Sequence, residues 1–248
     1  MSDTAPPARP PAGPPSGGSS PPEDTPAQAP DRAPEQAVVD LLGVLAYAEL
    51  IAFERLADDA RLAPTLADKA ALAAMAVAEF GHYQRLEMHL RRIGVDPAEA
   101  MRPFVEPLDA FHDSTAPSDW LESLVKAYVG DNIAADFYRE VARYVDEPTR
   151  ELVLDVLRDT GHASFAIDRV RAAIEADPAV AGRLALWARR LVGEALAQAQ
   201  RVAVDREALT DLIVGGASGS GGLAELGRTL ARLTEAHQQR MAALGLSA

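Results

Sequence analysis

Two short stretches of the chain combine a carboxylate with an imidazole at a spacing that suits metal binding. They are Glu79-Phe80-Gly81-His82 and Asp159-Thr160-Gly161-His162. On a helix, residues three apart lie on the same face about one turn apart, so both groups of each stretch project in one direction. Carboxylate oxygens and imidazole nitrogens are ligands of iron and manganese. Each stretch therefore predicts part of a metal site.

A further carboxylate precedes each stretch on an otherwise apolar helical stripe. Glu49 lies 30 residues before Glu79, and Asp131 lies 28 residues before Asp159. Burying an unpaired carboxylate costs several kcal/mol, and four such groups close together would also repel one another. Metal ions remove both costs, so we expect the two halves of the chain to enclose a dinuclear centre. Its expected ligands are Glu49, Glu79, His82, Asp131, Asp159 and His162.

The apolar periodicity of the chain predicts the helices that position these residues. Three helices are expected over residues 37–61, 66–93 and 118–145, and a fourth begins at Glu147 and continues through the second stretch without a break. Residues 95–117 show no helical period and contain four prolines, yet they are long enough to run the length of a bundle. Two helical hairpins joined by one long crossover form a ferritin-like four-helix bundle. We therefore predict an all-α fold of this kind.

The chain is predicted to extend beyond this bundle at both ends. The bundle is expected over residues 37–175 and accessory helices over residues 178–248, including a short helix that reaches Ile213 and a last helix at 223–244. These helices either pack outside the bundle or mediate dimerisation. Residues 1–36 contain 11 of the 18 prolines. They are predicted to form a disordered tail, because such a segment buries too little apolar surface to fold.

The composition excludes several classes of site and partner. The chain has no cysteine, so disulfides, zinc–thiolate sites, iron–sulfur clusters and a thiol nucleophile are all excluded. We see no run of about 18 apolar residues and no secretory signal, so we expect a cytoplasmic protein without a membrane partner. The net charge of −13 argues against a protein that coats nucleic acid, since phosphate binding relies on Lys and Arg.

A glycine stands directly before the histidine of each stretch, as Gly81 and Gly161. Glycine inside a helix costs about 1 kcal/mol relative to alanine. We therefore expect a neighbouring helix or a metal-bound ligand to need the space at these positions, with simple tolerance of glycine as the alternative.

Three segments resemble the ligand motifs of ferritin-like di-iron proteins. Glu49-Leu50-Ile51-Ala52 and Glu79-Phe80-Gly81-His82 resemble the first- and second-helix motifs of bacterioferritins and rubrerythrins, and residues 157–162 are similar to their fourth-helix Glu-x-x-His segment. The length and the added C-terminal helices resemble the MiaE-like group, which is named for a di-iron tRNA hydroxylase. The chain departs from the family at Asp131 and Asp159, where the family has glutamates, and the shorter side chains would alter the bridging geometry.

The resemblance implies a non-haem di-iron oxygenase. Two iron ions, or manganese in their place, would use O2 and electrons from an external donor to hydroxylate a C–H bond of an isopentenyl-type nucleoside in tRNA. The implied roles are one ion for each histidine, bridging for the carboxylate three residues before each histidine, and terminal binding for Glu49 and Asp131.

Two other functions stay open beside the oxygenase. One is a ferroxidase or a peroxide-scavenging protein of the rubrerythrin type. The other is a metal-free helical interaction protein whose polar core residues pair among themselves. The sequence also leaves open whether the chain forms a homodimer. The acidic net charge weighs against a tRNA substrate. Tyr83 and Tyr138 are expected either to pack in the core or to hydrogen-bond to the ligands.

Overall fold

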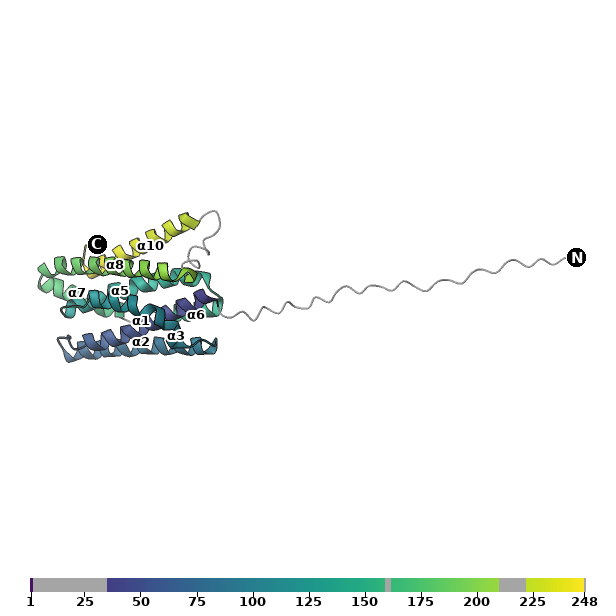
Figure 1. Ribbon diagram of the computed structural model, residues 1–248. Helices are drawn as coiled ribbons and strands as arrows, with labels where there is room; N and C mark the ends of the chain where they lie inside the picture. Colours follow the sequence, from purple (N-terminus) through teal and green to yellow (C-terminus); the bar gives the residue numbers. More distant parts are fainter. Residues whose placement is uncertain (2–34, 159–161, 210–221, 248) are drawn as a thin grey trace. The chain divides into compact units, whose positions relative to one another are not determined.

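The described part of the protein is built from helices alone, as predicted. A computed structural model describes residues 35–158, 162–209 and 222–247, together with Met1. Residues 34–248 form one compact unit, drawn in Figure 1. The predicted tail falls almost entirely outside the described residues, so its disorder stays a prediction. The elements are α1 (Gln36–Asp59), α2 (Leu66–Arg92), α3 (Pro97–Met101), η1 (Arg102–Phe104), α4 (Val105–Ser114), α5 (Trp120–Val141), η2 (Ala142–Tyr144), α6 (Glu147–Val156), α7 (His162–Ala176), α8 (Ala179–Asp205) and α10 (Gly222–Leu244).

The first two helices pack against each other along their length and form the first predicted hairpin. Short turns with polar caps fix where α2 and α5 begin. The Thr65 hydroxyl accepts a hydrogen bond from the Asp68 amide at 3.1 Å, and the Asp119 carboxylate accepts one from the Glu122 amide at 2.9 Å. Each cap satisfies an amide that has no partner within its helix. The faces that carry the predicted ligands are therefore set by local sequence.

The crossover between α2 and α5 is helical, so the prediction of an irregular connection was wrong. Its prolines occupy places where a helix does not need an amide hydrogen. Pro97 is the first residue of α3, and Pro103 and Pro107 lie in the first turns of η1 and α4. The first amides of a helix have no partner within the helix, so proline is tolerated there. Three of the four prolines that obscured the helical period therefore lie in the first turn of a short helix.

Gly43 marks the closest approach of the crossover to α1, and it carries a testable consequence. A Cβ at this position would overlap the carbonyl oxygen of Ala100 and lie 2.7 Å from its carbonyl carbon. Backbone atoms cannot turn aside, so Gly43→Ala is expected to separate α3 from α1 and to cost about 3 kcal/mol of unfolding free energy. Gly193→Ala is the control, because no described atom would lie within 4 Å of its Cβ. Thermal unfolding should show a lower Tm for the first variant only; two equal melting temperatures would contradict the close approach.

The fourth helix of the bundle is divided in two, whereas the sequence predicted one continuous helix. Helix α6 ends at Val156, and α7 begins at His162. The Arg139 guanidinium on α5 donates a hydrogen bond of 2.6 Å to the Leu157 carbonyl. A helix that continued through Leu157 would use this carbonyl for its own hydrogen bonds. A contact from α5 therefore marks the end of α6.

Ion pairs to α2 hold the two parts of this fourth helix separately. Asp155 of α6 pairs with Arg85, and Arg169 of α7 pairs with Asp68 at 2.7 Å. Asp68 is buried, so losing Arg169 would leave its charge with little hydration and without its ion-pair partner. The second of these pairs positions α7, and with it His162, against α2.

The accessory helices pack on the outside of the bundle, which was one of the two predicted alternatives. The Trp187 indole on α8 donates a hydrogen bond of 2.9 Å to the Glu122 carbonyl on α5. Helix α10 packs on α5 and α7 and buries Met241 and Leu244 completely. Glu140 on α5 is paired with α10 through Arg232, Nη2 to Oε2 at 2.9 Å. Most of the predicted short helix before Ile213 lies outside the described residues.

Helix α1 is long and apolar enough to cross a membrane by length and composition alone, contrary to the expectation from the sequence. Its mean hydropathy reaches 1.7 over 18 residues, and 56 % of that window is buried inside the protein. It also carries Glu49 into the core between apolar neighbours. The burial explains its apolar character as that of a core helix in a bundle.

Candidate metal centre

A polar layer crosses the bundle between two apolar clusters. On α1, Leu45 belongs to one cluster and Leu56 to the other, with Glu49 between them. Glu79 on α2 and Asp131 on α5 separate the same two clusters on their own helices. Apolar side chains thus enclose the layer from both ends of the bundle. Charges placed here lose much of their hydration, so they need compensation.

Glu49, Glu79 and His82 come together in this layer from α1 and α2. Each offers a ligand atom, and these atoms all lie within 4.8 Å of one another. The Nδ1 atom of His82 is 3.2 Å from Oε2 of Glu49 and 3.1 Å from Oε2 of Glu79. All three residues are buried. Two carboxylates and one imidazole at this separation can hold a metal ion.

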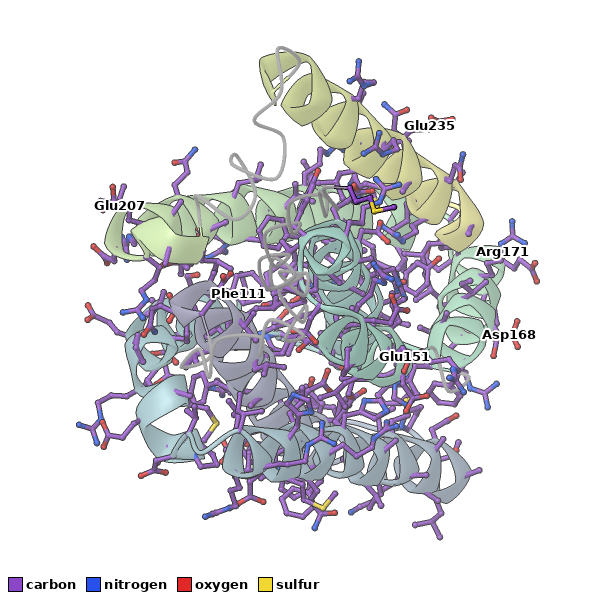
Figure 2. All side chains as sticks on the ribbon, turned by 90° about the vertical axis from the view of Figure 1, so that its right-hand side faces the viewer. Phe111, Glu151, Asp168, Arg171, Glu207 and Glu235 are labelled. Carbon is purple, nitrogen blue, oxygen red and sulfur yellow. The ribbon has the colours of Figure 1, made fainter. Side chains whose placement is uncertain are left out.

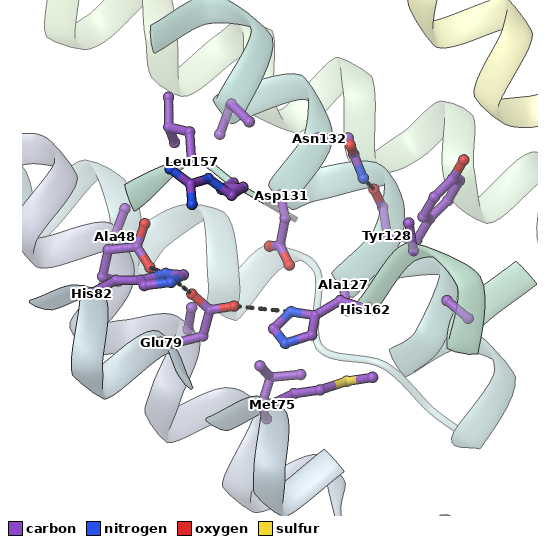
Figure 3. A pocket seen from close by; sticks show the side chains of 18 of the residues that line it. Ala48, Met75, Glu79, His82, Ala127, Tyr128, Asp131, Asn132, Leu157 and His162 are labelled. Atoms are coloured by element: carbon purple, nitrogen blue, oxygen red, sulfur yellow. Dashed lines mark hydrogen bonds and ion pairs between the residues drawn. The ribbon is translucent and has the colours of Figure 1, made fainter. Parts of the chain in front are cut away.

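Glu79 also connects this cluster with the second half of the bundle. Its other oxygen, Oε1, lies 3.1 Å from Nδ1 of His162, the first residue of α7. Figure 3 shows the Glu79 carboxylate between the two imidazoles, with one oxygen toward each. A carboxylate placed in this way can be shared by two ions, each of which binds one histidine.

Asp131 completes the described part of the predicted ligand set. It lines the same pocket, and its carboxylate points toward Glu79 and His162 in Figure 3. The Asp131 side chain is exposed because it faces the pocket, although protein atoms pack closely around it. Asp159, the sixth predicted ligand, lies outside the described residues. The structure thus brings five of the six predicted residues together, and their role as metal ligands stays a prediction.

Protons balance the charges of this layer as long as no ion is bound. Burial raises the pKa of Glu49, and burial together with the charge of Glu79 raises the pKa of Asp131. Hydrogen bonds to Glu49 and Glu79 raise the pKa of His82 to about 9. Burial also opposes ionisation of Glu79, but its hydrogen bonds to His162, His82 and Glu49 outweigh this effect and lower its pKa. A donor set of ionised carboxylate, protonated carboxylates and imidazoles fits divalent metal ions, which take the place of such protons.

The ligands line a largely apolar pocket of about 140 Å³. Leu56 and Leu72 line it seven residues from Glu49 and Glu79, which is about 10 Å along each helix. The pocket therefore extends from the ligands along the bundle. Other side chains in its lining that Figure 3 labels are Met75, Ala127, Tyr128, Asn132 and Leu157.

The sequence contained a signal for most of this lining but not for Arg139. Met75 and Ala127 lie four residues from Glu79 and Asp131, so they share the ligand-bearing stripes. Arg139 follows Asp131 by eight residues, which places it about 80° away around the helix. It lines the pocket nonetheless and donates to the Leu157 carbonyl. Only the tertiary structure shows this contact.

The sequence matches a family model described as a ferritin-like domain of actinomycetes over residues 32–216. The chain belongs to this ferritin-like family. The ferritin-like fold also relates it to a solved structure, described as protein 19 with aldehyde deformylating oxidase activity from Synechococcus. The TM-score is 0.64 at 22% sequence identity, and the match covers 86% of this chain and 92% of that chain.

These matches confirm the predicted ferritin-like bundle with added C-terminal helices. At 22% identity the solved structure supports the fold alone. No curated protein matches this ferritin-like sequence. Neither match names the MiaE-like group, so the assignment that they support is to the ferritin-like proteins in general.

Proposed function

We propose that this ferritin-like protein is an oxygenase that holds two iron ions, or manganese in their place, and hydroxylates a C–H bond of an apolar group in the pocket. The observation that carries the proposal is the position of Glu79, with one oxygen toward His82 and the other toward His162. The reaction is R–H + O2 + 2 e⁻ + 2 H⁺ → R–OH + H2O. The two electrons come from an external donor, since a chain without cysteine has no thiol or iron–sulfur carrier of its own.

In this proposal, His82 and His162 each bind one ion, and Glu79 is shared by both. Glu49 would bind beside His82, Asp131 would bind on the side of Glu79 and His162, and Asp159 would supply the remaining carboxylate. When bound, the metal pair supplies the reduction of O2. The residues of the chain hold the ions in place and keep water away with the apolar lining. Tyr138 is buried near Glu49 and lines the pocket beside it.

The size of the pocket limits the group that it can accept. An apolar cavity of roughly 150 Å³ accepts benzene, so a pocket of about 140 Å³ that also holds the metal ions accepts a group of at most about five or six carbons. We propose the five-carbon isopentenyl group of a tRNA nucleoside as substrate, which the resemblance to the MiaE-like group also supports. A short aldehyde is the second candidate, because it fits the same volume and the Synechococcus protein is named for an aldehyde-directed activity. An apolar pocket favours either of these substrates over a role in iron storage, because iron storage needs no apolar pocket.

The direct test compares these substrates on metal-loaded protein supplied with O2 and a chemical reductant. Mass spectrometry should find the isopentenyl nucleoside of tRNA one oxygen heavier after the reaction. The same nucleoside should lack this oxygen in tRNA from a strain in which the gene is deleted. An unaltered nucleoside profile in that strain would count against tRNA, and oxidation of a short aldehyde alone would assign the second substrate class.

Filling the pocket should separate substrate binding from metal binding. Leu72 is almost fully buried and lines the pocket one turn beyond Met75. Leu72→Phe is expected to reduce turnover at least about tenfold, because a larger side chain occupies the substrate volume. Metal content should not change, since Leu72 carries no ligand atom. Leu186→Phe on the exposed side of α8 is the control, and equal turnover in both variants would show that the pocket does not hold the substrate.

A further inference from the structure

Helix α2 presents an apolar face to solvent along most of its length. Leu66 is 85%, Val77 69%, Met88 61% and Phe80 37% exposed. Helix α2 lies at the lower edge of the bundle in Figure 1, and no other described helix lies below it there. Single exposed apolar residues are common, but a contiguous set marks an interaction surface. We define the α2 outer face as Leu66, Ala70, Ala73, Ala74, Val77, Phe80, Gln84 and Met88, all of them exposed.

This face is free of the acidic charge that the rest of the chain carries. Between residues 66 and 84 of α2, all of which the structure describes, Lys69 is the one exposed residue with a formal charge. The acidic residues of this stretch, Asp68 and Glu79, are buried. Other helices project charged side chains outward, as Asp168 and Glu235 do in Figure 2. Two copies with a net charge of −13 repel each other, so they approach most easily through a face without acids.

The residues of the α2 outer face are spaced symmetrically about Val77. Leu66 and Met88 lie eleven residues to either side of it, and Ala70 and Gln84 lie seven residues to either side. These intervals are close to whole turns, so the residues form one stripe. An antiparallel second copy, related by a two-fold axis at Val77, would therefore meet this stripe with the same stripe. Such a self-complementary contact is what a two-fold dimer requires.

The side chains on either side of this axis also match in size. The axis would place Phe80 against the partner's Ala74 and Met88 against the partner's Leu66, so that the aromatic ring meets a small residue. Gly81 would meet the partner's Ala73, and no described atom of its own protomer lies within 4 Å of a Cβ built on Gly81. Small residues at these places allow two helices to approach closely. The pattern fits a second copy of this chain better than an unrelated partner.

We propose that the α2 outer face is the interface of a homodimer, in which two α2 helices pack antiparallel about Val77. Helix α2 has 27 residues and is about 40 Å long. A contact of this length and about one helix width would bury on the order of 1,000 Å² in total, at the lower end of specific interfaces. Phe53 and Tyr83, whose rings lie 5.2 and 5.7 Å from that of Phe80, widen the patch. The dimer is therefore expected to dissociate at roughly micromolar concentration.

A single introduced cysteine tests this arrangement, because the natural chain has none. Helix axes about 9–10 Å apart place facing Cα atoms roughly 4–5 Å apart, which reaches the range of a disulfide. Full-length Val77→Cys should therefore form a disulfide-linked dimer under mild oxidation. Leu186→Cys on α8 is the matched control, since Leu186 is 67% exposed against 69% for Val77. Cross-linking of neither variant, or of both to the same extent, would overturn the proposal.

The register has a test of its own. Two copies of Ala70→Cys would lie about 21 Å apart and should not cross-link, whereas a mixture of Ala70→Cys and Gln84→Cys should give a mixed dimer. Sedimentation velocity should show wild-type protein changing from monomer to dimer with concentration. Val77→Glu should weaken the dimer at least tenfold, because it buries two facing carboxylates. A wild-type protein that stays monomeric at high micromolar concentration, or a Val77→Glu variant that dimerises as well as wild type, would overturn the interface.

Discussion

Replacing Glu79 by glutamine is expected to abolish metal binding at both positions of the centre. Among the described residues, Glu79 is the one whose carboxylate contacts both His82 and His162. Glutamine keeps the size of the side chain but removes the negative charge and one of the two acceptor oxygens. Even a residue that only orients a ligand changes metal affinity by about 10–100-fold, so loss of a shared ligand should exceed about 100-fold. Wild-type protein should hold about two ions per chain.

Elemental analysis after dialysis against iron or manganese measures this effect directly. Glu54→Gln is the matched control, because Glu54 lies on α1 but is exposed. His162→Ala should lose one ion rather than both, since His82 keeps its two carboxylate neighbours. Wild-type protein without metal, together with unchanged stability in these variants, would instead favour the metal-free helical interaction protein.

The parts of the fold that the sequence predicted well are those determined by local interactions. The apolar stripes and the polar caps at Thr65 and Asp119 lie within single helices, so α2 and α5 begin within two residues of their predicted positions. The break between α6 and α7 depends on Arg139, which reaches Leu157 from another helix. No periodicity within the fourth helix could reveal that contact. The helical crossover was missed because its prolines were taken as breaks rather than as helix starts.

The candidate site likewise combines features that local sequence predicted with features that depend on the tertiary structure. Five predicted residues meet because each lies on the inward stripe of its helix, and the stripes follow from the spacing of residues. No described atom lies within 4 Å of a Cβ built on Gly81, so no neighbouring helix of the same protomer needs the space that was expected there. One residue turns a helix by about 100°, which places Gly81 away from the direction of His82. Gly161, for which the same was expected, lies outside the described residues.

Metal affinity is expected to fall steeply as the pH is lowered from 8 to 6. The pKa of His82 is raised to about 9, so this imidazole carries a proton at neutral pH that a metal ion must displace. Each proton displaced weakens metal binding about tenfold per pH unit below the pKa of its group. His82 alone therefore predicts a loss of about 100-fold over these two units. The raised pKa values of Glu49 and Asp131 act in the same direction, whereas Glu79, with its lowered pKa, stays ionised throughout.

Competition of Mn²⁺ binding against a chelator of known pH dependence measures this slope, because Mn²⁺ resists oxidation during the titration. Calorimetry in two buffers of different ionisation enthalpy counts the protons released at pH 7. Glu49→Gln should reduce that count, since glutamine brings no titrating proton, and Glu54→Gln should leave it unchanged. An affinity that is independent of pH between 6 and 8 would mean that metal ions do not displace these protons. In that case the hydrogen-bonded cluster of Glu49, Glu79 and His82 would serve the fold rather than a metal centre.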